Sequence, residues 1–171
     1  FTVAPQKPCR DFVQATIVFV WIYSLDGIDS PGHFDQYMYE FWKVTDPALR
    51  REYLEAIWQF FHNTRSWNLC ISGSDENWND LSNDLTYEIL DVTAKYKYQT
   101  PNLTMRCHRN TPEKLMRAAY RAIATGCGMP TLYNDEVVCP ALERLGIPPC
   151  DSHHYVMNGC NQIDIQGKSH M

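Results

Sequence analysis

The stretch Gln99-Thr-Pro-Asn-Leu-Thr-Met-Arg-Cys-His-Arg-Asn-Thr-Pro112 decides the class of fold. Within it, apolar and polar side chains alternate with the period of a β-strand, Leu103, Met105 and Cys107 against Asn102, Thr104 and Arg106. Thr111 followed by Pro112 then predicts a helix start, with a capping residue and a proline at the first helical position. The helix is expected from Leu115 to Ala124, where Gly126 and Gly128 stop it.

Downstream of this stretch the same alternation of elements continues. A short strand is expected at 130–133, and a helix capped by Asn134 or Asp135 runs to about Leu145, kinked or split near Pro140. A last short strand is expected at 155–157. The order strand, helix, strand, helix, strand predicts an α/β architecture. Three short strands cannot close a sheet, so we expect their edges to pair with strands outside this chain.

Upstream, the chain is helix-rich. Residues 11–25 predict an apolar helix buried on most sides, ended by Asp29-Ser-Pro-Gly32. The aromatic run 34–42 predicts one or two helical turns in a core or interface. Asp46 and Pro47 predict the cap and first turn of a helix that reaches about residue 63. A short apolar segment at 68–70 precedes a loop, and a further helix is expected over 81–96.

Composition excludes several classes of protein. Of 171 residues, 44% are apolar, which suffices for a core and favours one domain or part of one. A formal charge of −5 without a basic cluster argues against nucleic acid or an anionic membrane as partner. The longest apolar run, residues 12–25, is shorter than the ~20 residues that span a bilayer.

The seven cysteines are odd in number and widely spread, without a CxxC pair or histidines at zinc spacing. Apart from Cys160, we expect them to be buried, reduced thiols of a cytoplasmic protein, and we expect no metal site.

The side chains of the adjacent pair His153-His154 would diverge, which favours a surface or capping role. Asn134-Asp135-Glu136 is interpreted as a helix cap with acids that the helix dipole favours. Arg106 and His108 could reach a substrate carboxylate or pair internally.

Several segments together resemble a known family. The segments 30–39, 83–91, 99–112, 128–142 and Asn158-Gly-Cys160 resemble, in the same order, motifs of glycyl radical enzymes of the pyruvate formate-lyase type. The resemblance covers nearly the whole chain. It implies that residues 1–171 are part of a single ten-stranded α/β barrel domain, whose N-terminal region and C-terminal glycyl radical domain lie outside this sequence. Such a piece, starting at Phe1 and ending soon after Cys160, is expected to be inactive alone.

The resemblance also implies a mechanism and its partners. Cys160 is placed where the family has its thiyl cysteine, and the radical is stored on a backbone glycine of the full-length enzyme. An activating enzyme that uses S-adenosylmethionine and an iron–sulfur cluster installs that radical, so no cofactor is expected in this chain. The implied activity is that of a lyase or dehydratase of anaerobic metabolism, acting on a small polar metabolite. Family members are often homodimers.

The residues around Cys160 suit hydrogen-atom transfer. The step needs a neutral thiol, and the nearest downstream cation, Lys168, is eight residues away. Gly159 leaves room for another backbone to approach. Dehydratases of the family commonly carry Gly-Cys-Val-Glu, whose Glu acts as a base; this chain has Gln162 there, and an amide cannot accept a proton. Asp164 is the nearest carboxylate that could take over that role.

Three alternatives stay open. A formate C-acetyltransferase-like C–C lyase is disfavoured, because such enzymes use two adjacent cysteines and Cys160 stands between Gly159 and Asn161. A non-catalytic truncated relative would keep the fold elements without the radical. A thiolate-based acyl transferase would need a base paired with Cys160.

Overall fold

The computed structural model describes residues 7–27, 30–160 and 162–169. Its centre is a four-stranded sheet in which every neighbouring pair is parallel and the strands lie in sequence order: β1 (Gly32–His33), β2 (Asn68–Ser72), β3 (Asn102–Cys107) and β4 (Thr131–Asn134). Strands β3 and β4 confirm the prediction, whereas β1 and β2 were not predicted. The reason is local: β1 has two residues, and β2 is buried at all five positions and carries no alternation.

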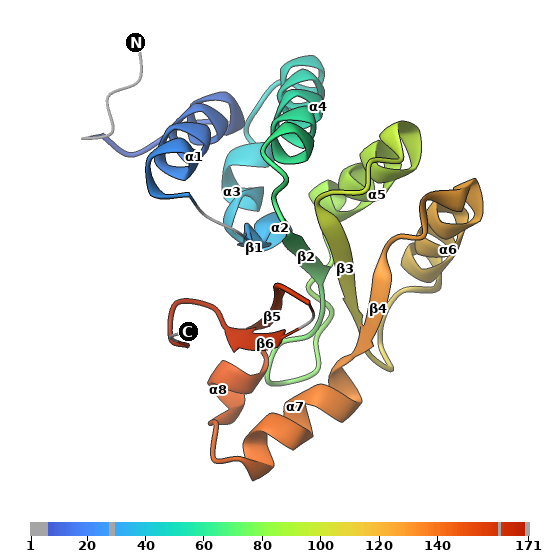
Figure 1. Cartoon of the computed structure of the whole chain (residues 1–171). Helices are drawn as coiled ribbons and strands as arrows, with labels where there is room; N and C mark the ends of the chain where they lie inside the picture. Colours follow the sequence, from blue (N-terminus) through green and yellow to red (C-terminus); the bar gives the residue numbers. More distant parts are fainter. Residues whose placement is uncertain (1–6, 28–29, 161, 170–171) are drawn as a thin grey trace.

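Helices connect these strands and cover the outer side of the curved sheet (Figure 1). A sequential parallel order without a reversal is that of a part of an α/β barrel, since open doubly wound sheets reverse their order. The connecting helices, in chain order, are α2 (Phe34–Tyr37), α3 (Tyr39–Trp42), α4 (Pro47–Asn63), α5 (Asp84–Tyr96), α6 (Glu113–Ala122) and the short π-helix η1 (Ile123–Cys127). The aromatic run 34–42 therefore forms the expected helical turns, and Phe34 and Trp42 are core residues.

The helix starts test the capping predictions. Asp46 caps α4 by accepting hydrogen bonds from the amides of Ala48 and Leu49, as expected. Helix α5 begins three residues later than predicted, at a reciprocal capping box of Asn83 and Thr86. The expected cap at Thr111 is wrong. Its hydroxyl accepts a hydrogen bond from the amide of His108 and thereby closes the loop before α6.

Helix α1 (Phe12–Asp26) forms as predicted but is less buried than expected. It packs beside α4 (Figure 1), while Trp21, Ile22 and Leu25 expose 47%, 46% and 71% of their surface. The helix ends at Gly27, whose left-handed backbone (φ 68°) caps it before the predicted breaker. Asp29, the first residue of that breaker, lies outside the described part of the chain.

The C-terminal part forms a second, smaller unit. Helix α7 (Asp135–Arg144) continues through Pro140, and α8 (Pro149–Ser152) follows it. Strand β5 (Tyr155–Asn158) does not join the parallel sheet; it pairs antiparallel with β6 (Gln162–Ile165), a strand that was not predicted. The larger core lies between the sheet and helices α1 and α4–α6, and a separate one joins α7 to the hairpin. Within the described ranges, no helix combines the length and apolar character that crossing a bilayer requires.

Candidate functional site

Cys160 lies at the tip of what we call the cysteine hairpin, residues 155–165, in the turn that follows β5. Its side chain is exposed. Gly159 has a left-handed backbone (φ 51°), and a Cβ added there would lie 3.4 Å from the ring of Trp67. The close approach expected at Gly159 is therefore made by an aromatic ring of this chain. Asn161, the other neighbour of Cys160, lies outside the described residues.

Gln162 and Asp164 meet on one face of the hairpin. They stand two residues apart on β6, so both side chains project from the same side of the strand. The amide of Gln162 donates to Oδ1 of Asp164 over 3.1 Å, and the amide of Asn158 on β5 donates to Oδ2 over 3.1 Å. Asn158 in turn accepts a hydrogen bond from the hydroxyl of Ser30 over 2.8 Å. Sequence reasoning missed Asn158 and Ser30, because β6 and the contact across 128 residues were not predicted.

A buried ion pair lies at the base of the hairpin. Arg106 on β3 donates to both carboxylate oxygens of Asp135 at the start of α7, each over 2.9 Å, and neither side chain is exposed. Asp135 also accepts hydrogen bonds from the amide and hydroxyl of Ser74 and from the hydroxyl of Tyr155, all over 2.8 Å. We call these four residues the arginine hub. Arg106 thus pairs internally. Asp135 stands in the first turn of α7 behind the Asn134 cap, as predicted, and its carboxylate is buried in the hub.

The hub keeps its charges despite burial. Burial alone would raise the pKa of Asp135, but the charge and hydrogen bonds of Arg106 hold it below its ordinary value. Arg106 also donates to the carbonyl oxygens of His153 and Tyr155, and its guanidinium lies 4.1 Å from the centre of the Tyr155 ring. A Cβ at Gly73 (φ 110°) would come within 2.8 Å of Arg106 Cζ, so glycine is required there. The hub therefore ties β3 and α7 to the first residue of the hairpin.

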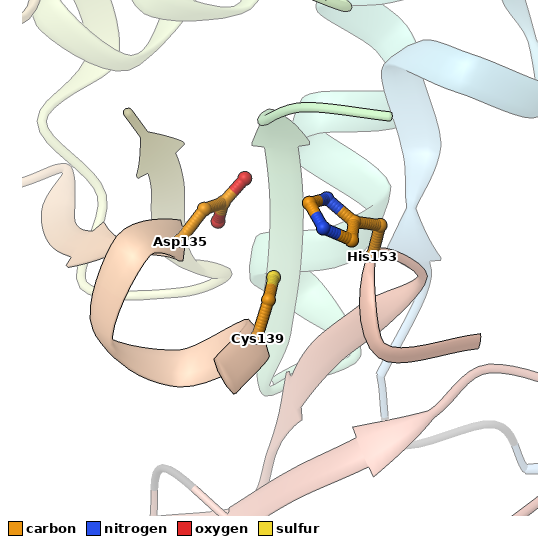
Figure 2. A group of neighbouring side chains, drawn as sticks. All are labelled: Asp135, Cys139 and His153. Carbon is orange, nitrogen blue, oxygen red and sulfur yellow. The ribbon is translucent and has the colours of Figure 1, made fainter. Parts of the chain in front are cut away.

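A group of possible metal ligands adjoins the hub (Figure 2). Asp135 and Cys139 on α7 and His153 after α8 point toward one another, with ligand atoms within 4.8 Å. Metal ligands must be deprotonated and free to coordinate. Both oxygens of Asp135 are committed to Arg106, and burial raises the pKa of Cys139 to about 12. The group is better suited to packing around the ion pair than to holding a cation.

The two histidines of the pair 153–154 differ. His153 is 3% exposed, and its Nδ1 lies 3.1 Å from the hydroxyl of Ser74, so it is not a surface residue. It does hold the C-cap position of α8, which agrees with the capping role. His154 is exposed, as predicted. His108, the other candidate for a substrate carboxylate, lies 3.4 Å from Asp80 and so also pairs internally.

A second buried titratable pair lies where β1 meets α2: His33 is the last residue of β1, and Asp35 lies in α2. Burial, reinforced by the charge of Arg106, lowers the pKa of His33 to about 3, so the ring is neutral and Nε2 donates to the carbonyl of Ser72 over 2.5 Å. Burial raises the pKa of Asp35 to about 6, although Ser72 and Thr86 donate to Oδ2. The 3.7 Å between His33 and Asp35 is therefore a contact of a neutral ring with a carboxyl group, not an ion pair.

The cysteines are free thiols in the described part of the chain. Cys70 and Cys139 are buried, and burial raises the pKa of Cys70 to about 12. The expectation that six thiols are buried is wrong for Cys150, which is exposed, and Cys9, Cys107 and Cys127 are half-buried. Unlike Cys150, Cys160 stands in the turn of a hairpin whose second strand, β6, carries a carboxylate held by two amides.

Comparison with known proteins gives a family and several relatives. Residues 2–171 match the model of the family described as pyruvate formate lyase-like. The chain is 29% identical to the probable dehydratase YbiW of Escherichia coli, over 95% of this chain and 24% of that protein. It is also 29% identical to isethionate sulfite-lyase of Bilophila wadsworthia, over 96% of this chain and 23% of that protein. The chain thus spans about a quarter of the length of these relatives.

Solved structures agree with this result. The B12-independent glycerol dehydratase of Clostridium butyricum superposes on 95% of this chain with a TM-score of 0.86 and 26% identity, using 24% of its own chain. A glycyl radical enzyme of Archaeoglobus fulgidus superposes on 93% with a TM-score of 0.81 and 26% identity, also using 24% of its chain. The predicted α/β fold class, a fragment of the barrel of glycyl radical enzymes, is confirmed.

Proposed function

This chain belongs to the pyruvate formate lyase-like family, and from that premise we propose that it is the cysteine-bearing part of a glycyl radical lyase or dehydratase. The relatives named above as dehydratases and a sulfite-lyase support that reaction class. Its substrate is a small polar metabolite. The observation that carries the proposal is the position of Cys160, exposed at the tip of a hairpin that is anchored by buried structure.

Residues 1–171 form part of one barrel domain, whose remaining strands pair with the outer edges of β1 and β4. Within the described residues each of these strands pairs on one side alone, which supports that arrangement. The glycyl radical domain and the N-terminal region belong to the rest of the full-length enzyme, which is a cytoplasmic homodimer of anaerobic metabolism. The free thiols support a reducing compartment.

Cys160 is the hydrogen-atom relay. In the full-length enzyme, Cys160 would give one hydrogen atom to a glycyl radical installed by an activating enzyme that uses S-adenosylmethionine and an iron–sulfur cluster. Homolysis of the S–H bond leaves one of its electrons unpaired on the sulfur, which then takes one hydrogen atom from a substrate carbon and becomes a thiol again. After the leaving group departs from the substrate radical, the product radical takes a hydrogen atom back from Cys160. The exposure of the Cys160 sulfur supports the approach of a glycine backbone from another part of the full-length enzyme.

Asp164 is the base that assists departure of the leaving group. Gln162 stands at the position of the family's Glu, and its amide cannot accept a proton. Gln162 and Asn158 each donate to one oxygen of Asp164, so the carboxylate is held beside the position that the family uses. In this arrangement Gln162, at the position of the family's Glu, orients Asp164, which takes over the role of that Glu.

Two other activities fit less well. A formate C-acetyltransferase-like C–C lyase would need a second cysteine beside Cys160, where this chain has Gly159 and Asn161. A thiolate acyl transferase would need a base bonded to Cys160, and in the described part of the chain the Cys160 sulfur has no hydrogen-bond partner. A non-catalytic truncated relative is the remaining alternative, and an activation experiment separates it from the enzyme.

The test is anaerobic activation of the full-length protein by its activating enzyme, followed by electron paramagnetic resonance and product analysis. The probes are glycerol, propane-1,2-diol, isethionate and trans-4-hydroxy-L-proline, with pyruvate and coenzyme A as the comparison. We expect a glycyl radical signal and elimination of water or sulfite from a compound of the first panel. Formate and acetyl-coenzyme A from pyruvate would favour the C–C lyase, and absence of any signal would favour the non-catalytic relative.

A further inference from the structure

The cysteine hairpin is joined to the start of the sheet at two separated points. Near its tip, the hydroxyl of Ser30 donates to Oδ1 of Asn158 over 2.8 Å. At its base, directly after β6, the side-chain oxygen of Gln166 accepts a hydrogen bond from the backbone amide of His33 over 3.0 Å. Both contacts reach the same four-residue segment, 30–33, from opposite ends of the hairpin.

The backbone of that segment is shaped for the second contact. Gly32 has φ +70°, a conformation that side chains rarely adopt. A Cβ added at Gly32 would lie 3.0 Å from the side-chain amide of Gln166. The space that a larger residue would fill is therefore taken by Gln166, and the turn aims the amide of His33 at its oxygen.

We propose that residues 30–33 act as a clamp that sets the position of Cys160, with Ser30, Asn158 and Gln166 as positioning residues. This inference rests on the proposed role of Cys160 and adds to it the residues that hold the sulfur in place. The arginine hub fixes the first residue of β5, five positions before Cys160. The ladder between β5 and β6 fixes these strands to each other. The clamp adds side-chain hydrogen bonds from the tip and the base of the hairpin to residues 30–33.

Position matters because hydrogen-atom transfer needs its two partners nearly in contact. Misplacing a reacting group by about 1 Å can cost on the order of 10²-fold in rate. Asn158 also donates to Asp164, so the same contact orients the proposed base. Loss of the clamp should therefore lower the rate of the chemical step more than the affinity for substrate.

The test compares variants of the full-length protein. Ser30→Ala and Gln166→Ala each remove one side of the clamp, and their combination removes both. Ser30→Thr keeps the hydroxyl and Gln166→Glu keeps the acceptor oxygen, so these variants should rescue. Ser24→Ala on α1, whose hydroxyl donates to its own helix, and Gln59→Ala on α4 are matched controls.

Two readouts are combined. In the unactivated protein, amide hydrogen exchange of residues 155–165 should accelerate at least about tenfold in the double variant, with β2 and β3 unchanged. In the activated protein, kcat per radical should fall about tenfold in each single variant and about 10²-fold in the double one. The spin count and KM should stay within about twofold of wild type. The probe is the panel compound that the wild-type protein turns over.

The outcomes separate the two claims. Wild-type exchange in the hairpin of the double variant, or an unchanged kcat per radical, overturns the clamp whatever Cys160 does. Equal losses in the controls or in the conservative variants overturn it as well. If turnover instead survives Cys160→Ser, the proposed function fails, and the exchange measurement alone decides whether residues 30–33 hold the hairpin.

Discussion

The two ends of the cysteine hairpin differ in what surrounds them. At the base, Arg106 and Asp135 are fully buried, and Asp135 is bonded by Arg106, Ser74 and Tyr155. At the tip, Cys160 is exposed, and farther along β6 the carboxylate of Asp164 is held by two neutral amides. The base is buried like a protein core, whereas the tip is exposed where another segment can reach it.

This difference assigns separate tasks to the two ends. Buried ion pairs that lose one partner leave an uncompensated charge, so changes at the base should appear in stability. Exposed groups contribute little to stability, so changes at the tip should appear in turnover. Variants at the two ends test whether residues at the base of the hairpin determine stability and residues at its tip determine turnover.

The largest effect on stability is expected at the base. Arg106→Leu leaves Asp135 charged and buried, and the free energy of unfolding should fall by about 3–5 kcal/mol. Urea denaturation measures the change. Arg121→Leu, at an exposed position on α6, is the control and should stay within about 0.5 kcal/mol of wild type. A loss below about 1 kcal/mol for Arg106→Leu would mean that the hub is not the anchor.

At the tip, Asp164→Asn should leave stability nearly unchanged and lower turnover. The neutral amide cannot accept a proton, so kcat of the activated full-length enzyme should drop about 10²-fold or more. Asp91→Asn, on an exposed position of α5, serves as the control. A near-normal rate for Asp164→Asn would reject Asp164 as the base.

The buried residues His33 and Asp35 should make the stability of the fold depend on pH. His33 is buried and neutral with a pKa of about 3, so the unfolded chain binds its proton first as pH falls below the ordinary value of 6.5. His33 therefore costs stability as pH falls from about 6 to 4, by about 1.4 kcal/mol per pH unit. Asp35, with its pKa raised to about 6, binds its proton first in the folded state and acts in the opposite direction over the same range.

The measurement is the free energy of unfolding of wild type and His33→Gln at several pH values. Gln keeps a donor for the carbonyl of Ser72 but does not titrate. The free energy of unfolding of His33→Gln should rise relative to that of wild type by about 1.4 kcal/mol for each unit by which pH falls between 6 and 4. Parallel curves for the two proteins would show that His33 titrates alike in both states.

Sequence alone predicted the elements whose signal is local. The alternation of β3 and the Asp46 cap of α4 depend on a few neighbouring residues, and both were correct. Strand β2 was missed because both of its faces are buried, which removes the alternation. The hub was missed because Arg106 and Asp135 are 29 residues apart, and no local pattern pairs them.

The candidate site divides in the same way. Cys160 was singled out through the family motif, and the structure places it, exposed, in the turn after β5; its catalytic role stays a prediction. Gln162 and Asp164 were singled out as separate candidates, but their contact needs strand β6, which places positions two apart on one face. Recognising β6 from Gln162-Ile-Asp-Ile165 would have predicted that contact. The hydrogen bond from Ser30 to Asn158 joins residues that are 128 positions apart, so only the folded structure reveals it.

The most direct test of the account is Cys160→Ser in the full-length protein after anaerobic activation, with radical content and turnover measured in the same sample. The account predicts a glycyl radical signal close to that of wild type, with turnover reduced by at least about 10³-fold, because the hydroxyl cannot relay the hydrogen atom. Cys150→Ser, which alters the other exposed thiol, should behave as wild type. Turnover that survives the loss of the Cys160 sulfur would contradict the account.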